Sequence, residues 1–227
     1  MNLTSLAGKR ILLTQANLFM GPALTELLTE MGASVIGDEQ PLLDPALPAQ
    51  LVRDAGHVDV LIAHLGVPAP NTSVLDGDED EWRSMFAHMV DPLPRLARAV
   101  LPQMIERRSG KILLMGSASA LRGMKRASSY SAARGAQLAW AQAVGVEMAP
   151  HNVQVNAIAQ NLVDNPTYFP PEVQTLPKFK ERIKWEMPLG RLVSAQEDAH
   201  FAAYLCSEAA NNFVGQIFPV CGGWVPR

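Results

Sequence analysis

This sequence has few cysteines, little net charge and no long apolar run. The 227 residues include only two cysteines, Cys206 and Cys221, which excludes a disulfide framework and a cysteine-rich metal site. The formal net charge of −3 argues against bulk nucleic-acid binding, which needs clustered Lys and Arg to neutralise phosphates. No apolar run reaches the ~18 residues of a membrane helix, and the opening MNLTSLAGKR lacks a signal core. These absences predict a reduced, soluble, cytoplasmic protein.

Histidine is present but is not arranged for metal binding. The five histidines show no ligand spacing, such as two on one helical face, so no metal site is predicted. His64 stands at the expected carboxyl end of a strand, where ligands bind in many folds, but a structural role is favoured for it.

Strand-like apolar runs alternate with helix-length amphipathic stretches along the chain. The clearest runs are residues 11–14, 33–39, 58–65, 110–117 and 152–159, and residues 213–223 contain a sixth or seventh. This alternation indicates parallel strands joined by right-handed crossovers, hence one doubly wound α/β domain over residues 1–227. Several runs are apolar at successive positions, as expected when helices cover both faces of the sheet.

Two proline-rich stretches interrupt this pattern. Residues 40–50 leave little room for a full helix before the third strand. Residues 164–177 follow the fifth strand and precede the charged segment KFKERIKWEM. A long insertion at the carboxyl end of a parallel strand is where ligands bind in such sheets.

Three polar side chains form a pattern that suits acid–base chemistry. Ser117 ends the fourth run, and Tyr130 and Arg134, four positions apart, face the same side of the next predicted helix. A free phenol, with a pKa of ~10, is a poor base at neutral pH, and a fixed cation beside it favours the phenolate. Ser117 could hold a substrate oxygen while Tyr130 removes its proton. The spacing alone fits surface residues equally well, but its place after an apolar strand and on a helix favours a catalytic site.

The layout resembles the short-chain dehydrogenase/reductase superfamily over essentially the whole chain. The resemblance rests on the strand–turn–helix start, on Ser117 and Tyr130, on NVQVNAIA and on the C-terminal glycine pair. It implies a single Rossmann-like domain with a mainly parallel, seven-stranded sheet flanked by helices. Members carry Lys at the position of Arg134, which Arg does not replace equivalently.

The turn after the first strand also departs from the superfamily. Members open with Thr-Gly-x-x-x-Gly-x-Gly, which admits the dinucleotide pyrophosphate, whereas this chain reads TQANLFMG. Gln15 and Phe19 occupy the first two glycine positions, and only Gly21 is retained. Since these glycines allow close approach of the backbone to phosphate, no dinucleotide cofactor is expected.

A Ser-Tyr-Arg trio with a degenerate glycine turn is similar to that of the halohydrin dehalogenases, especially their B-type members. Further similar segments are KRILLTQANLFMG, VLPQMIERRSGKILLMGSASA and HNVQVNAIAQN. The resemblance implies cofactor-independent closure of a vicinal haloalcohol to an epoxide, with release of halide and a proton. Tyr130 would be the base, assisted by Arg134, and Ser117 would position the oxygen. The reverse reaction would open epoxides with azide, cyanide, nitrite or halide.

The same resemblance assigns a pocket for the leaving halide and an assembly. The implied substrate loop spans about residues 160–188. Its halide contacts would be Gln160, Asn161, Leu162 and Val163, closed by Phe19, with Tyr168 and Phe169 as walls. The expected assembly is a homotetramer, a dimer of dimers, that pairs helices around residues 82–107 and 130–148. Small molecules are the only other partners expected, without nucleic acid or membrane.

Two other functions stay open at this point. The chain could be an NAD(P)-dependent short-chain reductase with a degenerate glycine turn, which cofactor binding would reveal. It could also be an inert scaffold with a reductase-like fold, but Ser117 and Tyr130 are retained at the spacing that the chemistry requires.

Overall fold

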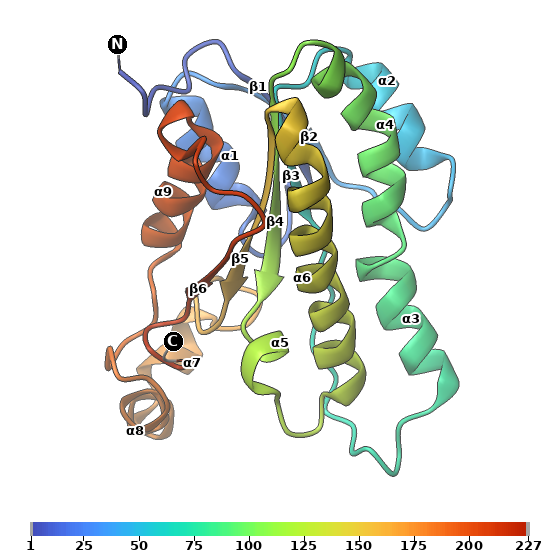
Figure 1. The fold of residues 1–227 in the computed structure, drawn as a ribbon. Coiled ribbons are helices and arrows are strands. Elements are labelled where there is room, and N and C mark those ends of the chain that lie inside the picture. Colours follow the sequence, from blue (N-terminus) through green and yellow to red (C-terminus); the bar gives the residue numbers. More distant parts are fainter. Residues whose placement is uncertain (1, 226–227) are drawn as a thin grey trace.

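A six-stranded parallel sheet forms the centre of the protein (Figure 1). The computed structural model describes residues 2–225, and the sheet order within them is β2-β1-β3-β4-β5-β6, with every neighbouring pair parallel. The strands are β1 (Arg10–Thr14), β2 (Ser34–Asp38), β3 (Val60–His64), β4 (Gly110–Ser117), β5 (Val153–Gln160) and β6 (Ile217–Val220). The predicted doubly wound α/β class is confirmed.

Helices cover both faces of this sheet (Figure 1). One face carries α1 (Gly21–Glu30) and α9 (Ala195–Cys206). The other carries α2 (Leu47–Ala55), α3 (Glu79–Met89), α4 (Pro92–Glu106) and α6 (Ser128–Met148). The short helices α5 (Ser119–Arg122), α7 (Pro171–Thr175) and α8 (Pro177–Glu186) lie at the carboxyl end of the strands.

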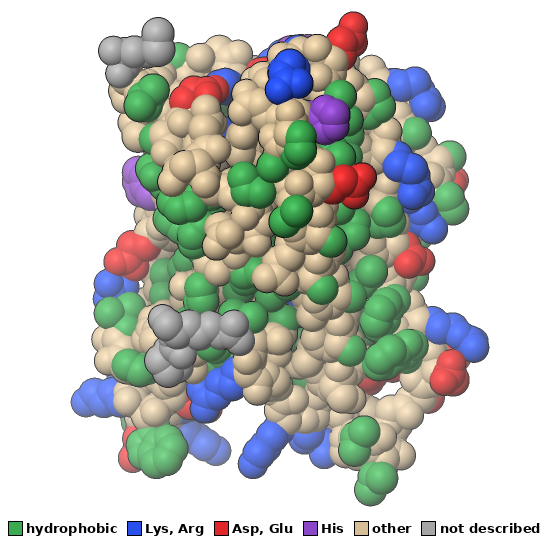
Figure 2. All heavy atoms as spheres, viewed as in Figure 1, with side chains coloured by type: hydrophobic (Ala, Val, Ile, Leu, Met, Phe, Trp, Pro, Cys, Tyr) green, Lys and Arg blue, Asp and Glu red, His purple; other side chains and the backbone are tan. Residues whose placement is uncertain are grey.

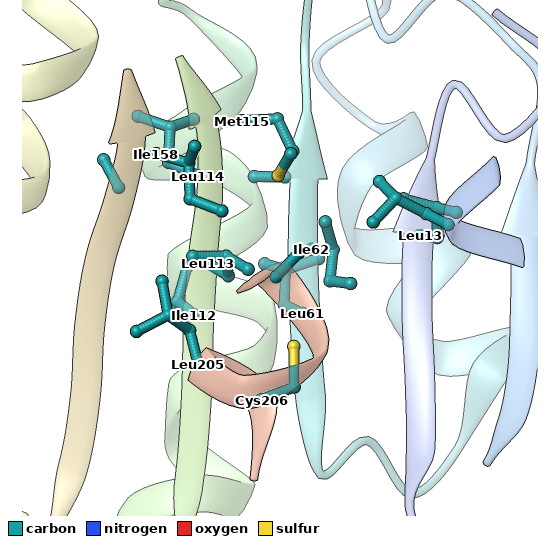
Figure 3. Packing of buried hydrophobic residues seen from close by; sticks show 14 of the residues in the cluster. Leu13, Leu61, Ile62, Ile112, Leu113, Leu114, Met115, Ile158, Leu205 and Cys206 are labelled. Atoms are coloured by element: carbon teal, nitrogen blue, oxygen red, sulfur yellow. The ribbon is translucent and has the colours of Figure 1, made fainter. Parts of the chain in front are cut away.

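The core follows from strands that are apolar on both faces. All eight residues of β4 are buried, and its side chains pack between those of β3 and β5 (Figure 3). Leu205 and Cys206 of α9 close the core from one side and are 3% and 0% exposed. Burial of such side chains contributes about 1.5–3 kcal/mol each and fixes the strands that lead to the site.

The predicted seventh strand is absent from the described residues. The proline-rich stretch after β2 does not add a strand at this edge of the sheet, because proline has no N–H to donate to a ladder. It leads instead into α2, whose first turn accommodates Pro48. Residues 40–50 thus hold only the start of α2, which runs for nine residues and ends at Ala55.

The helical segment expected around residues 82–107 is divided in two. Asp78 caps α3 by accepting the backbone N–H of Glu81, and α3 ends at Met89. Pro92 then begins α4, as suits a residue without an N–H in a first helical turn. No helix within residues 2–225 is long and apolar enough to cross a membrane.

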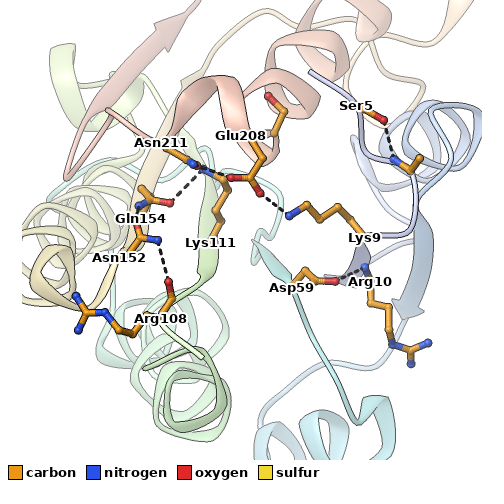
Figure 4. A network of polar contacts seen from close by, with 12 residues as sticks. Ser5, Lys9, Arg10, Asp59, Arg108, Lys111, Asn152, Gln154, Glu208 and Asn211 are labelled. Carbon is orange, nitrogen blue, oxygen red and sulfur yellow. Dashed lines mark hydrogen bonds and ion pairs between the residues drawn. The ribbon is translucent and has the colours of Figure 1, made fainter. Parts of the chain in front are cut away.

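A polar network joins distant parts of the chain at the amino end of the strands (Figure 4). Lys9, just before β1, donates to Glu208 at 2.5 Å. Lys111 on β4 donates to Asn211 at 2.7 Å and to Gln154 at 3.2 Å. Burial lowers the pKa of Lys111 to about 8. These contacts tie the start of the chain to the segment that follows α9.

Candidate active site

A cavity of about 280 Å³ opens at the carboxyl end of the strands. It is lined by every residue that the sequence analysis assigned to a site, namely Phe19, Ser117, Tyr130, Arg134, Gln160, Asn161, Leu162, Val163, Tyr168 and Phe169. These residues come from four separate segments of the chain, which the parallel topology brings to one edge of the sheet. The wall also includes residues that had not been assigned to the site, among them Met20, His64, Met124 and Asn165.

Arg134 places a buried positive charge at this cavity. It lies on α6, is 7% exposed, and donates to the carbonyls of Leu65 and Met115 and to Gln137 at 2.9–3.2 Å. None of the ion pairs among the described residues includes Arg134, and its Nε has no partner. Because a buried charge is costly without compensation, the site favours a negative species beside this guanidinium.

Tyr130 lies one helical turn before Arg134, as predicted. Its side chain is 6% exposed, and Cζ of Arg134 lies 5.1 Å from the centre of its ring. The two side chains thus share one face of α6 and both line the cavity. This arrangement places a phenol, which can exchange a proton, beside a permanent cation.

Ser117 reaches the cavity from the end of β4. Its Oγ accepts the hydroxyl of Ser119 at 2.9 Å and the backbone N–H of Ser119 at 3.2 Å. With both acceptor positions engaged, the hydroxyl proton of Ser117 is free to be donated to a ligand oxygen. The sequence indicated Ser117 but gave no signal for the supporting role of Ser119.

Aromatic rings close the opposite wall. Phe19 stacks on Tyr168, with ring centres 5.5 Å apart, and meets the His64 ring edge-on at 5.9 Å. The hydroxyl of Tyr168 accepts the backbone N–H of Ala69 at 3.1 Å. Burial, and then the neighbouring charge of Tyr130, raise the pKa of Tyr168 to about 12. Tyr168 therefore stays protonated at neutral pH and serves as a hydrogen-bonding wall.

His64 is the main residue of the cavity that the sequence analysis set aside. It ends β3, is 3% exposed, and its Nδ1 has no partner. Burial, together with the charge of Arg134, lowers its pKa to about 4, so the ring is neutral at physiological pH. Its place at a strand's carboxyl end was the one available signal. Residues 2–225 contain no cluster of three or more His, Cys, Asp or Glu able to hold a metal.

Comparison with known proteins assigns the family. A family model described as enoyl-(acyl carrier protein) reductase matches residues 8–225. The chain belongs to the short-chain dehydrogenase/reductase superfamily. Within it, the 2-keto-3-deoxy-L-fuconate dehydrogenase of Xanthomonas campestris is 29% identical over 247 residues, which cover 97% of this chain and 81% of the relative.

Solved structures of this superfamily's fold include enzymes of a different activity. A structure of a dehalogenation enzyme aligns with a TM-score of 0.89 at 29% identity, covering 97% of this chain and 99% of that one. Halohydrin dehalogenase bound to ethyl (2S)-oxiran-2-ylacetate aligns with a TM-score of 0.88 at 27% identity, covering 95% and 96%. Sequence relatives and structural neighbours therefore point to two activities on one fold.

The dinucleotide cofactor of the superfamily does not fit the turn between β1 and α1. Gln15 and Phe19 keep the left-handed backbone that glycine allows, with φ of 50° and 47°, but add side chains. The Gln15 amide accepts the N–H of Gly66 at 2.8 Å and donates to its carbonyl at 2.9 Å. This pair of bonds joins the ends of β1 and β3, where the crevice of a doubly wound sheet should open.

One feature of a dinucleotide site is nevertheless present. Asp38 ends β2, where an acidic residue holds the ribose hydroxyls in dinucleotide-binding folds. Its side chain is 6% exposed, and its Oδ2 has no partner. Burial raises the pKa of this carboxyl above its ordinary value. Asp38 was not among the residues predicted from the sequence, although an acidic residue at this distance from a glycine turn is a recognised signal.

Proposed function

We propose that this protein is a cofactor-independent halohydrin dehalogenase that converts vicinal haloalcohols to epoxides. The observation that carries the proposal is the filled turn, in which Gln15 is bonded to Gly66 and Phe19 forms a wall of the cavity. The buried guanidinium of Arg134, which no carboxylate neutralises among the described residues, supports it. A reaction through an alkoxide and a departing halide supplies the negative charge that such a site favours.

The proposed step is an internal displacement. Tyr130, acting as the general base beside Arg134, takes the proton of the substrate hydroxyl while Ser117 donates a hydrogen bond to that oxygen. The oxygen's electron pair forms a bond to the neighbouring carbon, and the carbon–halogen pair leaves with the halide. Epoxide, halide and one proton, held first on Tyr130, are the products. The cavity contributes by holding the halogen opposite the attacking oxygen.

Charge around the cavity supports an anionic product. Lys and Arg side chains gather over the end of the molecule that carries α5 and α8, at the lower edge of Figure 2. The exposed cations in and near these helices are Arg122, Lys125, Arg126, Lys178, Lys180, Arg182 and Lys184, and they outnumber the carboxylates of α8, Glu181 and Glu186, of which Glu186 pairs with Arg182. A positive field at a cavity mouth raises the local concentration of small anions, which suits the reverse opening of epoxides.

The test is halide and proton release from 1,3-dichloro-2-propanol by purified protein without nicotinamide. Release with formation of epoxide is expected, and Tyr130→Phe should reduce it at least about 100-fold because a general base is lost. The melting temperature of the variant serves as the fold control. Wild-type turnover in Tyr130→Phe would remove Tyr130 as the base.

An NAD(P)-dependent reductase is the second candidate, and Asp38 is the residue that favours it. Titration with NADH and NADPH distinguishes the two functions. Saturable binding of either, without halide release from haloalcohols, would replace the proposal with this reductase.

We also propose a homotetramer built as a dimer of dimers. Trp82 on α3 is 45% exposed and Val146 on α6 is 70% exposed, and hydrophobic side chains gather over α3 in Figure 2. Light scattering checks the assembly, since a monomeric mass would contradict it.

A further inference from the structure

A buried carboxyl group lies directly behind the cavity. Asp198, in the first turns of α9, is 0% exposed. Its Oδ2 accepts a hydrogen bond from Nε2 of Gln160, and its Oδ1 is buried without a partner. Neither Tyr130 nor Ser117 contacts it in the step proposed above, so this carboxyl has no role yet.

Gln160 connects Asp198 to the cavity. It ends β5 in register with Ser117, and its carbonyl accepts the backbone N–H of Ala118 at 2.7 Å. The backbone of Gln160 is therefore fixed by the sheet, and the residue lies between the cavity that it lines and Asp198, to which its side chain is bonded. The side-chain amide can change which end it presents there without disturbing the strand, because its two ends are nearly identical in shape.

The buried position of Asp198 brings the pKa of its carboxyl group close to neutral pH. Burial raises its pKa to about 7, and the hydrogen bond from Gln160 opposes the rise. On α9 itself, Glu197 and His200 face solvent. Of the elements packed on α9, α1 bears Glu26 and Glu30, both exposed, β4 bears Lys111 near its opposite end, and the turn that follows α9 bears Glu208, which binds Lys9. No charged group among these contributes to the shift.

We propose that Asp198 is a positioning residue that sets which end of the Gln160 amide faces the cavity, and thereby makes anion binding there depend on its protonation. Ionised Asp198 accepts from Nε2 and leaves the carbonyl end, which repels anions, for the cavity. Protonated Asp198 donates to the carbonyl end, so that the NH₂ group turns to the anion and the buried negative charge is gone. The inference rests on the proposed function, since it concerns the same halide pocket.

Bromide binding measured by calorimetry between about pH 5.5 and 8.5 tests the inference, because a linked proton makes affinity pH-dependent. The wild-type protein should lose up to about tenfold in bromide affinity per pH unit above neutrality, the limit for one linked proton. Asp198→Asn, which is nearly isosteric and cannot ionise, should bind bromide with little pH dependence. Gln160→Met, which removes the amide, should also make bromide affinity nearly independent of pH. This variant tests the role of Asp198 if Asp198→Asn does not fold.

The outcomes separate the two proposals. Bromide binding with the same pH profile in wild type and in the variants would overturn the role of Asp198 and leave the dehalogenase function standing. A bromide affinity of the wild type that does not change with pH would likewise overturn the role of Asp198 and leave the dehalogenase function standing. Absence of bromide binding by the wild type at every pH would instead contradict the proposed function, and the inference with it.

Discussion

The left-handed backbone conformation of Phe19 predicts that a glycine at this position is more stabilising than an alanine. Phe19 has φ of 47° and is half-buried, with its ring between Tyr168 and His64. We consider two truncations at this position, Phe19→Ala and Phe19→Gly. Both remove the same ring contacts, so the difference between the two variants isolates the backbone at this position.

The magnitude follows from opposing effects. A side chain with a Cβ costs roughly 1–2 kcal/mol in the left-handed region, and glycine avoids this cost. Glycine in turn loses about 0.4–1 kcal/mol more conformational entropy on folding. Phe19→Gly should therefore have a free energy of unfolding about 0.5–1 kcal/mol higher than Phe19→Ala. Each should lie below the wild type, by about 1–3 kcal/mol, because a partly buried ring and two aromatic contacts are lost.

Urea denaturation of both variants measures this difference. Leu18 is the matched control, because it adjoins Phe19, is 41% exposed and is not among the residues with positive φ. At Leu18 the usual order should hold, with the Ala variant more stable than the Gly variant by about 0.5–1 kcal/mol. Equal stabilities at position 19, or a more stable Ala variant there, would refute the reasoning that the turn keeps a glycine-type backbone under strain.

Two further predictions concern residues that line the cavity. The pKa of His64 is lowered from 6.5 to about 4 in the folded protein, so the unfolded chain binds a proton first as the pH falls. The free energy of unfolding should therefore decrease by about 3 kcal/mol between about pH 6.5 and pH 4. His64→Gln should lose correspondingly less between pH 7 and 4.5 in urea denaturation, and an unchanged slope would contradict the assignment. Arg134→Lys should reduce halide release about tenfold or more, because a compact ammonium does not reproduce the planar guanidinium beside the Tyr130 ring. Undiminished release would show that the fork geometry is unimportant.

The sequence was sufficient wherever the signal was local or periodic. The apolar runs located the strands, and the four-residue interval between Tyr130 and Arg134 placed both on one face of α6. The resemblance assigned residues as distant as Phe19 and Tyr168 to one pocket, and the carboxyl ends of the parallel strands do bring them together. The number of strands was wrong because it came from the resemblance, while the prolines after β2 argue against a strand there.

Contacts between distant side chains could not be predicted from the sequence. Nothing near Asp198 in the sequence indicates that it lies against Gln160, because that contact depends on how α9 packs on the sheet. The bonds from Gln15 to Gly66 are of the same kind. For His64, the sequence predicted the position at the end of β3. Its neutral, buried state could not be predicted, because it depends on the packing of α6 and of the turn after β1.

The bond between Lys9 and Glu208 has a consequence for the order of events during synthesis. The two residues are separated by 199 positions, and the backbone of Ala209 also donates to the carbonyl of Leu3. At about 5–20 residues per second, the ribosome releases Glu208 some 10–40 s after Lys9. During that interval β1 can already pair with β2 and β3, but Lys9 has no carboxylate to bind. The contacts that join the segment before β1 to Glu208 and Ala209 are therefore expected to form after the strands on either side of β1 have paired.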